Sequence, residues 1–169
     1  MLILFFPVFC FSQKKWTAYE QDISFKIKNA GITVTGRFTG MKTDLMFSPD
    51  KLSGSKLKGK AEVATIKTGI NKRDEDLLGE KYFDTARYKY IEIVSTKLYA
   101  KDANYAGLFN VTIKGVTKQV EIPFEFNQLG DETEFKGSFN LKRSDFGIGG
   151  KTLTMSDDLV VAIVIKAKS

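Results

Sequence analysis

Strict alternation between apolar and polar side chains runs through most of the chain after its first dozen residues. The alternating segments are 23–28, 32–38, 45–47, 57–63, 91–95, 111–113, 120–126 and 135–142. A period of two residues indicates β-strands with one buried face. A last segment, 159–167, begins apolar on both faces, which favours a strand that is covered on its outer side as well.

Turn-forming residues separate these segments. Ser48-Pro49-Asp50, Leu129-Gly130-Asp131 and the glycine-rich stretch 147–150 each punctuate a connection, and Asn29-Ala30-Gly31 favours a tight reversal. About eight strands with mostly short connections are enough to close a barrel. The sequence therefore predicts an all-β fold, an antiparallel eight-stranded barrel.

One stretch, 71–83, breaks the alternation and predicts a short helix between strands. Asn71 is the expected N-cap, and the three acidic residues 74–76 fall in the first turn. Leu78 and Tyr82 are four residues apart and would share a face, although Gly79 weakens the helix. We expect this helix to act as a lid or plug for one barrel mouth, or to cover the last strand.

The first twelve residues carry no charged side chain and are apolar over 2–11 apart from Pro7. This apolar stretch is about half the length of a membrane-spanning helix, so we interpret 1–12 as a signal peptide that is cleaved after Ser12. Residues 13–169 then form a single β-barrel domain, in the periplasm or secreted. Cleavage removes Cys10, the only cysteine, so the mature chain has no disulfide.

The absence of histidine from the whole chain, together with the loss of Cys10, limits the chemistry that the mature protein can perform. Serine–histidine and cysteine–histidine nucleophiles and ordinary zinc sites are excluded. Acidic clusters remain at 74–76, 131–134 and 157–158, but each falls at a helix start or a turn, where solvated carboxylates are the rule. We therefore expect no enzyme activity, no metal site and no cofactor.

The net charge of +6 comes mostly from lysines scattered along the chain. Such a distribution is typical of a solvated exterior, and it does not predict a nucleic-acid surface. It is compatible with a transient contact with an anionic membrane surface.

Four polar motifs follow one another in an order that is more distinctive than the core. They are NKRDEDLL at 71–78 with Tyr82-Phe83-Asp84 after it, VTIKGVTK at 111–118, LKRSDFGI at 141–148 and SDDL at 156–159. These motifs resemble those of the YceI family, and the resemblance extends over about 16–167. Asn29 and Asp76 stand where many members carry histidine, and Gln119 replaces the usual proline, so polar contacts made by the family's histidines do not transfer.

The resemblance implies a lipocalin-like barrel whose apolar tunnel binds polyisoprenoid lipids, such as a quinone or polyprenyl chain, in exported bacterial proteins. Small residues on the predicted inward face, among them Gly36, Gly59, Ala61 and Gly137, favour a hollow interior. The expected tunnel residues are Phe25, Ile27, Val34, Phe38, Phe47, Ala61, Val63, Ile91, Ile93, Val111, Ile113, Phe124, Phe139, Val161 and Ile163.

Four polar residues are candidates either for contacts with a lipid head group or for structural roles: Arg73, Asp74, Arg143 and Asp145. We favour the structural interpretation, in which Asp74 caps the helix and Arg143 or Asp145 anchors the glycine-rich hairpin.

The leading hypothesis is an exported, non-enzymatic binding protein, monomeric or homodimeric, that holds a long-chain polyisoprenoid or similar lipid in the barrel interior. Two alternatives remain at this stage. One is a carboxylate-dependent enzyme that acts on a bound lipid through Asp74 and Asp84. The other is a basic β-barrel interaction module that binds an anionic polymer through its lysines.

Overall fold

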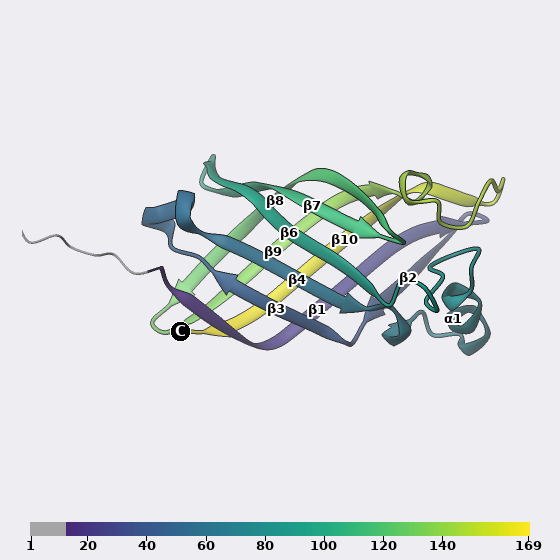
Figure 1. Cartoon of the computed structure of the whole chain (residues 1–169), viewed down its shortest axis with the longest axis horizontal. Helices are drawn as coiled ribbons and strands as arrows, with labels where there is room; N and C mark the ends of the chain where they lie inside the picture. The colour runs from purple at the N-terminus through teal and green to yellow at the C-terminus, as the bar shows by residue number, and fades with distance from the viewer. Residues whose placement is uncertain (1–12) are drawn as a thin grey trace, which may run out of the picture.

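The sheet closes on its first strand, β1 (Lys15–Asn29), in the computed structural model, which describes residues 13–169 (Figure 1). The predicted signal peptide, 1–12, lies outside the described residues. One edge of β1 pairs with β10 (Met155–Lys168), from Thr17 opposite Lys168 to Asn29 opposite Met155. Its other edge pairs first with β3 and then with β2. Both edges are therefore used, and between Thr17 and Asp22 β1 pairs with β10 alone.

The other strands follow in an antiparallel order, and two of the barrel's strands are each broken into two pieces. The strands are β2 (Ile32–Phe38), β3 (Met41–Met46), β4 (Lys56–Glu62), β5 (Ile66–Lys67), β6 (Tyr90–Lys101), β7 (Asn104–Ile113), β8 (Val116–Leu129) and β9 (Glu132–Lys142). The sheet order is β10-β9-β8-β7-β6-β4-β3-β1, with β2 and β5 continuing the lines of β3 and β4. The predicted eight-stranded antiparallel barrel is confirmed.

The predicted reversal at Asn29-Ala30-Gly31 is a two-residue hairpin. Ala30 and Gly31 both have positive φ angles, 50° and 79°, which is the requirement of the type I′ turn that matches the twist of a hairpin. The turn sets β2 against β1 so that Phe25 lies opposite Gly36 and Ile27 opposite Val34. The inward phase of the first hairpin is thereby fixed.

The helix α1 (Asn71–Leu78) is shorter than predicted, and its N-cap is Ile70 rather than Asn71. It ends at Gly79, after which the chain folds back through hydrogen bonds from Phe83 N to Leu77 O (3.1 Å) and from Asp84 N to Gly79 O (2.9 Å). This return places Phe83 beside Leu77 and Leu78, all packed on the buried cluster of Phe38, Ala61 and Ile66. The helix therefore closes over one end of the barrel, as the lid interpretation predicted.

The expected outer cover of the last strand is wrong. Val160 is 44% exposed, and Ala162 and Val164 on the same face are partly exposed. α1 lies at the barrel mouth instead, and no element within 13–169 packs over this face. The valines still favour an extended backbone, which explains the apolar run without a covering element.

An aromatic cluster fills the barrel at the end opposite α1. We call it the closed end, and its residues are Trp16, Phe47, Tyr105, Phe124, Phe126 and Phe135. The ring centroid of Phe47 lies 4.8 Å from that of Phe126 and 5.2 Å from that of Tyr105. Trp16 Nε1 donates a hydrogen bond to the Phe47 carbonyl at 2.9 Å. This end is packed like a protein interior.

Candidate functional site

Along β10, the inward-facing side chains are buried at the closed end and partly exposed toward α1. On β10, Ile165 and Ala167 are 6% and 0% exposed. Leu159, Val161 and Ile163 continue the same inward phase on the same strand but remain partly exposed. Because these side chains point into the barrel, the space that they face is empty.

The main cavity has an empty volume of ≈ 1010 Å³, including the open space at its mouth. Its walls come from most of the barrel strands, from the segment around α1 and from the glycine-rich loop 147–154. Only two lining side chains, those of Tyr82 and Arg143, carry polar atoms. A second cavity of ≈ 550 Å³ shares Ile93 and Ile163 with the first and reaches Phe124 and Phe135 at the closed end. The two cavities therefore adjoin, the main one toward α1 and the second toward the closed end.

Most of the predicted tunnel residues line the main cavity: Phe25, Ile27, Phe38, Ala61, Ile91, Ile93, Val111, Ile113, Phe139, Val161 and Ile163. Phe124 lines the second cavity. Val34, Phe47 and Val63 line neither. Phe47 lies at the centre of the closed end, Val63 is buried in the short turn of helix at 63–65, and Val34 is partly exposed on β2.

Several lining residues were not predicted from the sequence: Ile23, Leu77, Tyr82, Phe83, Leu141, Phe146, Ile148, Met155 and Leu159. Ile23, Leu141 and Leu159 share the phase of residues that were predicted, so the alternation alone could have identified them. Phe146 ends the short helical turn after β9 and Ile148 lies in the loop beyond it, where no period of two applies.

The small inward residues divide into two groups. Gly59 and Gly137 line the second cavity, although a Cβ at Gly59 would lie 2.9 Å from Ile93 Cγ2 and one at Gly137 3.2 Å from Pro123 O. Gly36 does not contribute volume, because a Cβ there would collide with the ring of Phe25. Gly36 instead gives Phe25 its place on the opposing strand.

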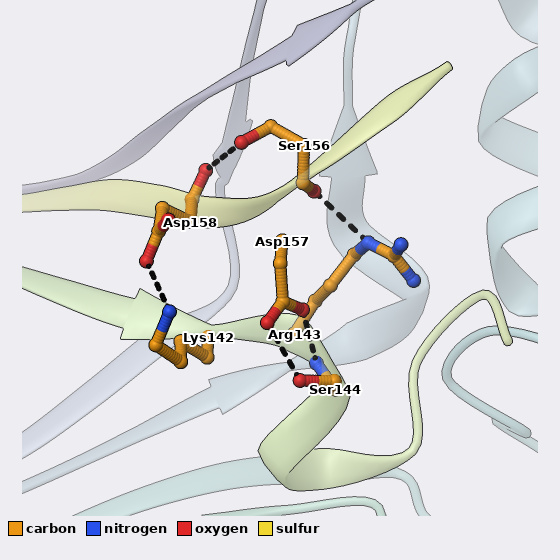
Figure 2. Close-up of polar contacts among 6 residues, drawn as sticks. All are labelled: Lys142, Arg143, Ser144, Ser156, Asp157 and Asp158. Carbon is orange, nitrogen blue, oxygen red and sulfur yellow. Dashed lines mark hydrogen bonds and ion pairs between the residues drawn. The ribbon is translucent and has the colours of Figure 1, made fainter. Parts of the chain in front are cut away.

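Arg143 is the one charged side chain in the main cavity lining, and it is only 6% exposed. Its guanidinium donates to the carbonyl oxygens of Ser156 (2.9 Å), Ile148 (2.8 Å), Gly150 (2.7 Å) and Met155 (3.3 Å). Figure 2 shows the side chain reaching from the end of β9 toward the start of β10. Arg143 thus ties the glycine-rich loop to β10 at the cavity mouth, as its structural interpretation predicted.

Arg73, Asp74 and Asp145 line neither cavity. Asp74 Oδ1 accepts hydrogen bonds from Thr68 N (2.8 Å) and Thr68 Oγ1 (2.5 Å), and Arg73 Nη2 donates to Thr68 O at 2.7 Å. Asp74 therefore holds the chain before α1 and does not cap the helix, which has no side-chain cap. Asp145 is exposed. Of the two candidate anchors, Arg143 and Asp145, it is Arg143 that holds the glycine-rich loop.

Asp157 secures the short helical turn Arg143–Phe146 to β10 from the outside (Figure 2). Its carboxylate accepts from Ser144 N at 2.9 Å and from Ser144 Oγ at 2.7 Å. These two hydrogen bonds, the side-chain one first, hold the pKa of the Asp157 carboxyl below its usual range because they favour the charged form.

Ser144→Ala is expected to raise the pKa of Asp157 toward the ordinary aspartate value, because the side-chain hydrogen bond is lost while the backbone one remains. Carbonyl-detected NMR titration measures this shift. Ser156→Ala is the matched control, since the Ser156 hydroxyl donates to the Asp158 carbonyl and not to Asp157. An unchanged Asp157 pKa in Ser144→Ala would contradict the assignment.

The remaining carboxylates offer the cavity no acid or base. Asp84 is buried and forms an ion pair with Arg87 at 3.6 Å, but neither Asp84 nor Asp74 lines the main cavity. Within 13–169, no three metal-ligating side chains come together to hold an ion. The same residues contain no helix long and apolar enough to cross a membrane. The main cavity, with its apolar lining, is suited to enclosing an apolar molecule.

Comparisons with known proteins agree with this architecture. A crystal structure of BcnA from Burkholderia cenocepacia has a TM-score of 0.84 at 24% identity, over 88% of this chain and 96% of that one. A YCEI protein of Campylobacter jejuni gives 0.74 at 24% identity, over 80% and 85%. A polyisoprenoid binding domain from Saccharophagus degradans gives 0.68 at 13% identity, over 92% and 97%. All three share the fold.

Sequence comparisons place the chain in a family. A UPF0312 protein of Pseudomonas savastanoi pv. phaseolicola is 29% identical over 138 residues, which is 76% of this chain and 71% of that protein. A UPF0312 protein of Yersinia pestis is 24% identical over 133 residues, or 75% and 69%. The family model described as the YceI-like domain matches residues 16–167, nearly all of the described barrel. The chain therefore belongs to the YceI-like family.

Proposed function

We propose that the protein is an exported binding protein that holds a long-chain polyisoprenoid or similar lipid inside the barrel and catalyses no reaction. The observation that carries this proposal is the main cavity, ≈ 1010 Å³ in empty volume and lined almost entirely by apolar side chains. Burial of a lipid chain contributes about 0.8 kcal/mol per methylene, before the cost of ordering the chain. Binding of a long lipid therefore needs no polar contact.

The shape of the hollow space favours a long, narrow ligand. The two cavities share Ile93 and Ile163, and the second reaches the closed end. A chain that enters beside α1 can extend through both. The similarity in fold to a polyisoprenoid binding domain supports the same class of ligand.

The mouth offers a place for a polar head group. Tyr82 and Arg143 both line the main cavity, and four hydrogen bonds to backbone carbonyls already fix the Arg143 guanidinium. A carbonyl or hydroxyl oxygen of the ligand would meet a positive charge there.

Export through cleavage of residues 1–12 would bring the protein to the periplasm or outside the cell, where a lipid needs shielding from water.

The direct test is organic extraction of natively purified protein followed by mass spectrometry. A polyisoprenoid or similar lipid in about molar amounts is the expected result. Protein that yields no lipid, and takes up none from mixtures of quinones and polyprenols, would overturn the proposal.

Val161→Trp is expected to reduce the recovered lipid several-fold, because the larger ring projects into the main cavity that Val161 lines. Stability should fall by no more than about 1–3 kcal/mol, the usual range for overpacking, since the added atoms enter empty space. Lipid per mole of protein is measured by mass spectrometry, and the fold is checked by circular dichroism.

Val160→Trp is the matched control, because Val160 is the neighbouring residue on β10 and points outward with 44% of its surface exposed. It should retain the lipid content of the unmodified protein. Equal lipid content in both variants would show that the ligand does not occupy the space in front of Val161.

A further inference from the structure

Two large apolar side chains project from adjacent loops at the cavity mouth. Ile32, next to the β1–β2 turn, is 70% exposed, and Leu153, in the glycine-rich loop 147–154, is fully exposed. The two loops are joined by a hydrogen bond from Ala30 N to Thr154 O at 2.7 Å. We call Ile32 and Leu153 together the apolar tip.

The apolar tip borders the opening of the main cavity. Asn29 pairs with Ile32 on one side and with Met155 on the other. Met155, two residues after Leu153, lines the main cavity, and so does Ile27, two residues before Asn29. Figure 1 shows the β1–β2 turn and the loop before β10 at the same end of the barrel as α1, opposite the C-terminus. The apolar tip therefore lies at the end of the barrel where the main cavity is lined by Met155 and Ile27.

Within the two segments that carry the apolar tip, the charge has one sign. The segments 23–43 and 146–156 contain no Asp or Glu, while Lys28 and Lys151 flank the two exposed side chains. Both lysines are exposed. Protruding apolar side chains with basic neighbours suit an anionic bilayer, in which the apolar groups enter the interface and the lysines meet lipid phosphates. A protein partner would instead need a broad complementary face of about 800 Å², which two convex loop ends do not offer.

We propose that the apolar tip docks the barrel mouth on an anionic lipid bilayer, so that the cavity opens toward the membrane. Ile32 and Leu153 insert into the interface, and Lys28 and Lys151 hold the mouth against it. The purpose of docking rests on the proposed function: an apolar ligand passes between bilayer and cavity without exposure to water. Docking itself is measurable without any ligand in the cavity.

Leu153→Trp tests the insertion directly. With vesicles of equal parts phosphatidylethanolamine and phosphatidylglycerol, the introduced tryptophan should shift its emission to shorter wavelength and become shielded from acrylamide. Trp16, the natural tryptophan, is 2% exposed and gives a constant background. Leu129→Trp is the matched control, because Leu129 is 86% exposed at the end of β8, where Asp131 O accepts a hydrogen bond from the C-terminal Ser169 N. No shift in Leu153→Trp, or an equal shift in both, would overturn the proposal.

Binding strength gives a second, independent readout. In co-sedimentation with the same vesicles, Ile32→Ser combined with Leu153→Ser should weaken binding about tenfold or more, since two apolar side chains no longer leave water. Leu129→Ser should bind like the unmodified protein. Lys28→Gln and Lys151→Gln should each weaken binding about fivefold, and only on anionic vesicles.

Equal binding of the double serine variant and the unmodified protein would overturn the docking proposal. If lipid is still recovered by extraction, the proposed function stands without it. If no lipid is recovered while vesicle binding is retained, the proposed function fails and the docking proposal stands. The two proposals can therefore fail separately.

Discussion

Phe47→Ala is expected to lower the free energy of unfolding by about 3–5 kcal/mol. Phe47 is 0% exposed, and its ring contacts Tyr105, Phe124, Phe126 and Phe135 at centroid distances of 5.2, 5.6, 4.8 and 5.7 Å. Truncation removes the buried ring and leaves a void that its neighbours can fill only in part. Urea denaturation followed by circular dichroism measures the loss.

Phe139→Ala is the matched control at the hollow half of the barrel. Phe139 is 8% exposed but also lines the main cavity, so its loss enlarges an existing space. We expect a clearly smaller loss of stability, together with an altered lipid content. Equal losses for the two variants would contradict the division of the barrel into a solid and a hollow half.

The closed end has a functional consequence. Trp16, fixed by its hydrogen bond to the Phe47 carbonyl, and the surrounding rings block the interior at the side of the C-terminus. The main cavity therefore lies toward α1 and the glycine-rich loop. Under the proposed function, a ligand would enter and leave at this end, past the side chains around the mouth.

The barrel itself could be predicted from the sequence because its cause is local. Alternation fixes which side chains point inward along each strand, and Gly31 and Gly130 mark hairpins through their turn chemistry. The breaks between β2 and β3 and between β4 and β5 were not predicted, since they depend on how neighbouring strands bend to close the sheet.

The extent of the cavity could not be predicted from any one strand. Ile163 and Ile165 are alike in type and phase, yet Ile163 lines both cavities, whereas Ile165 lines only the second and is 6% exposed. The difference comes from the volume that rings elsewhere in the barrel, such as those of Phe47 and Phe126, contribute to the interior. The alternation therefore assigns Phe47 to the tunnel, although its ring fills the closed end. The pattern shows which side chains point inward, but not how much of the interior the side chains of other strands fill.

The polar candidates show the same limit. Arg143 and Asp145 are two residues apart in one motif, but only Arg143 is buried. Its role depends on carbonyl oxygens that come from the glycine-rich loop and the start of β10. Such a three-dimensional set of acceptors leaves no periodic trace in the sequence.

Arg143→Ala is expected to lower the free energy of unfolding by about 3 kcal/mol or more and to release the glycine-rich loop. The side chain is 6% exposed and donates four hydrogen bonds to backbone carbonyls. Each hydrogen bond from a charged donor contributes about 1.5–3 kcal/mol, not additively, and buried carbonyls left without a donor add a penalty. Urea denaturation measures the stability, and hydrogen exchange of the loop amides measures its release.

Two neighbouring substitutions separate this role from charge alone. Arg143→Lys keeps the charge but cannot reach acceptors spread on both sides of a planar guanidinium, so it should lose most of the same stability. Lys142→Ala removes only the exposed ion pair with Asp158 and should leave stability unchanged. If Arg143→Ala unfolded like the unmodified protein, Arg143 would not be the anchor of the mouth.

Release of the loop would also remove Ile148 from the cavity wall and Leu153 from the apolar tip. Lipid content and vesicle binding should therefore fall together in Arg143→Ala. Val161→Trp, in contrast, should lower the lipid content alone.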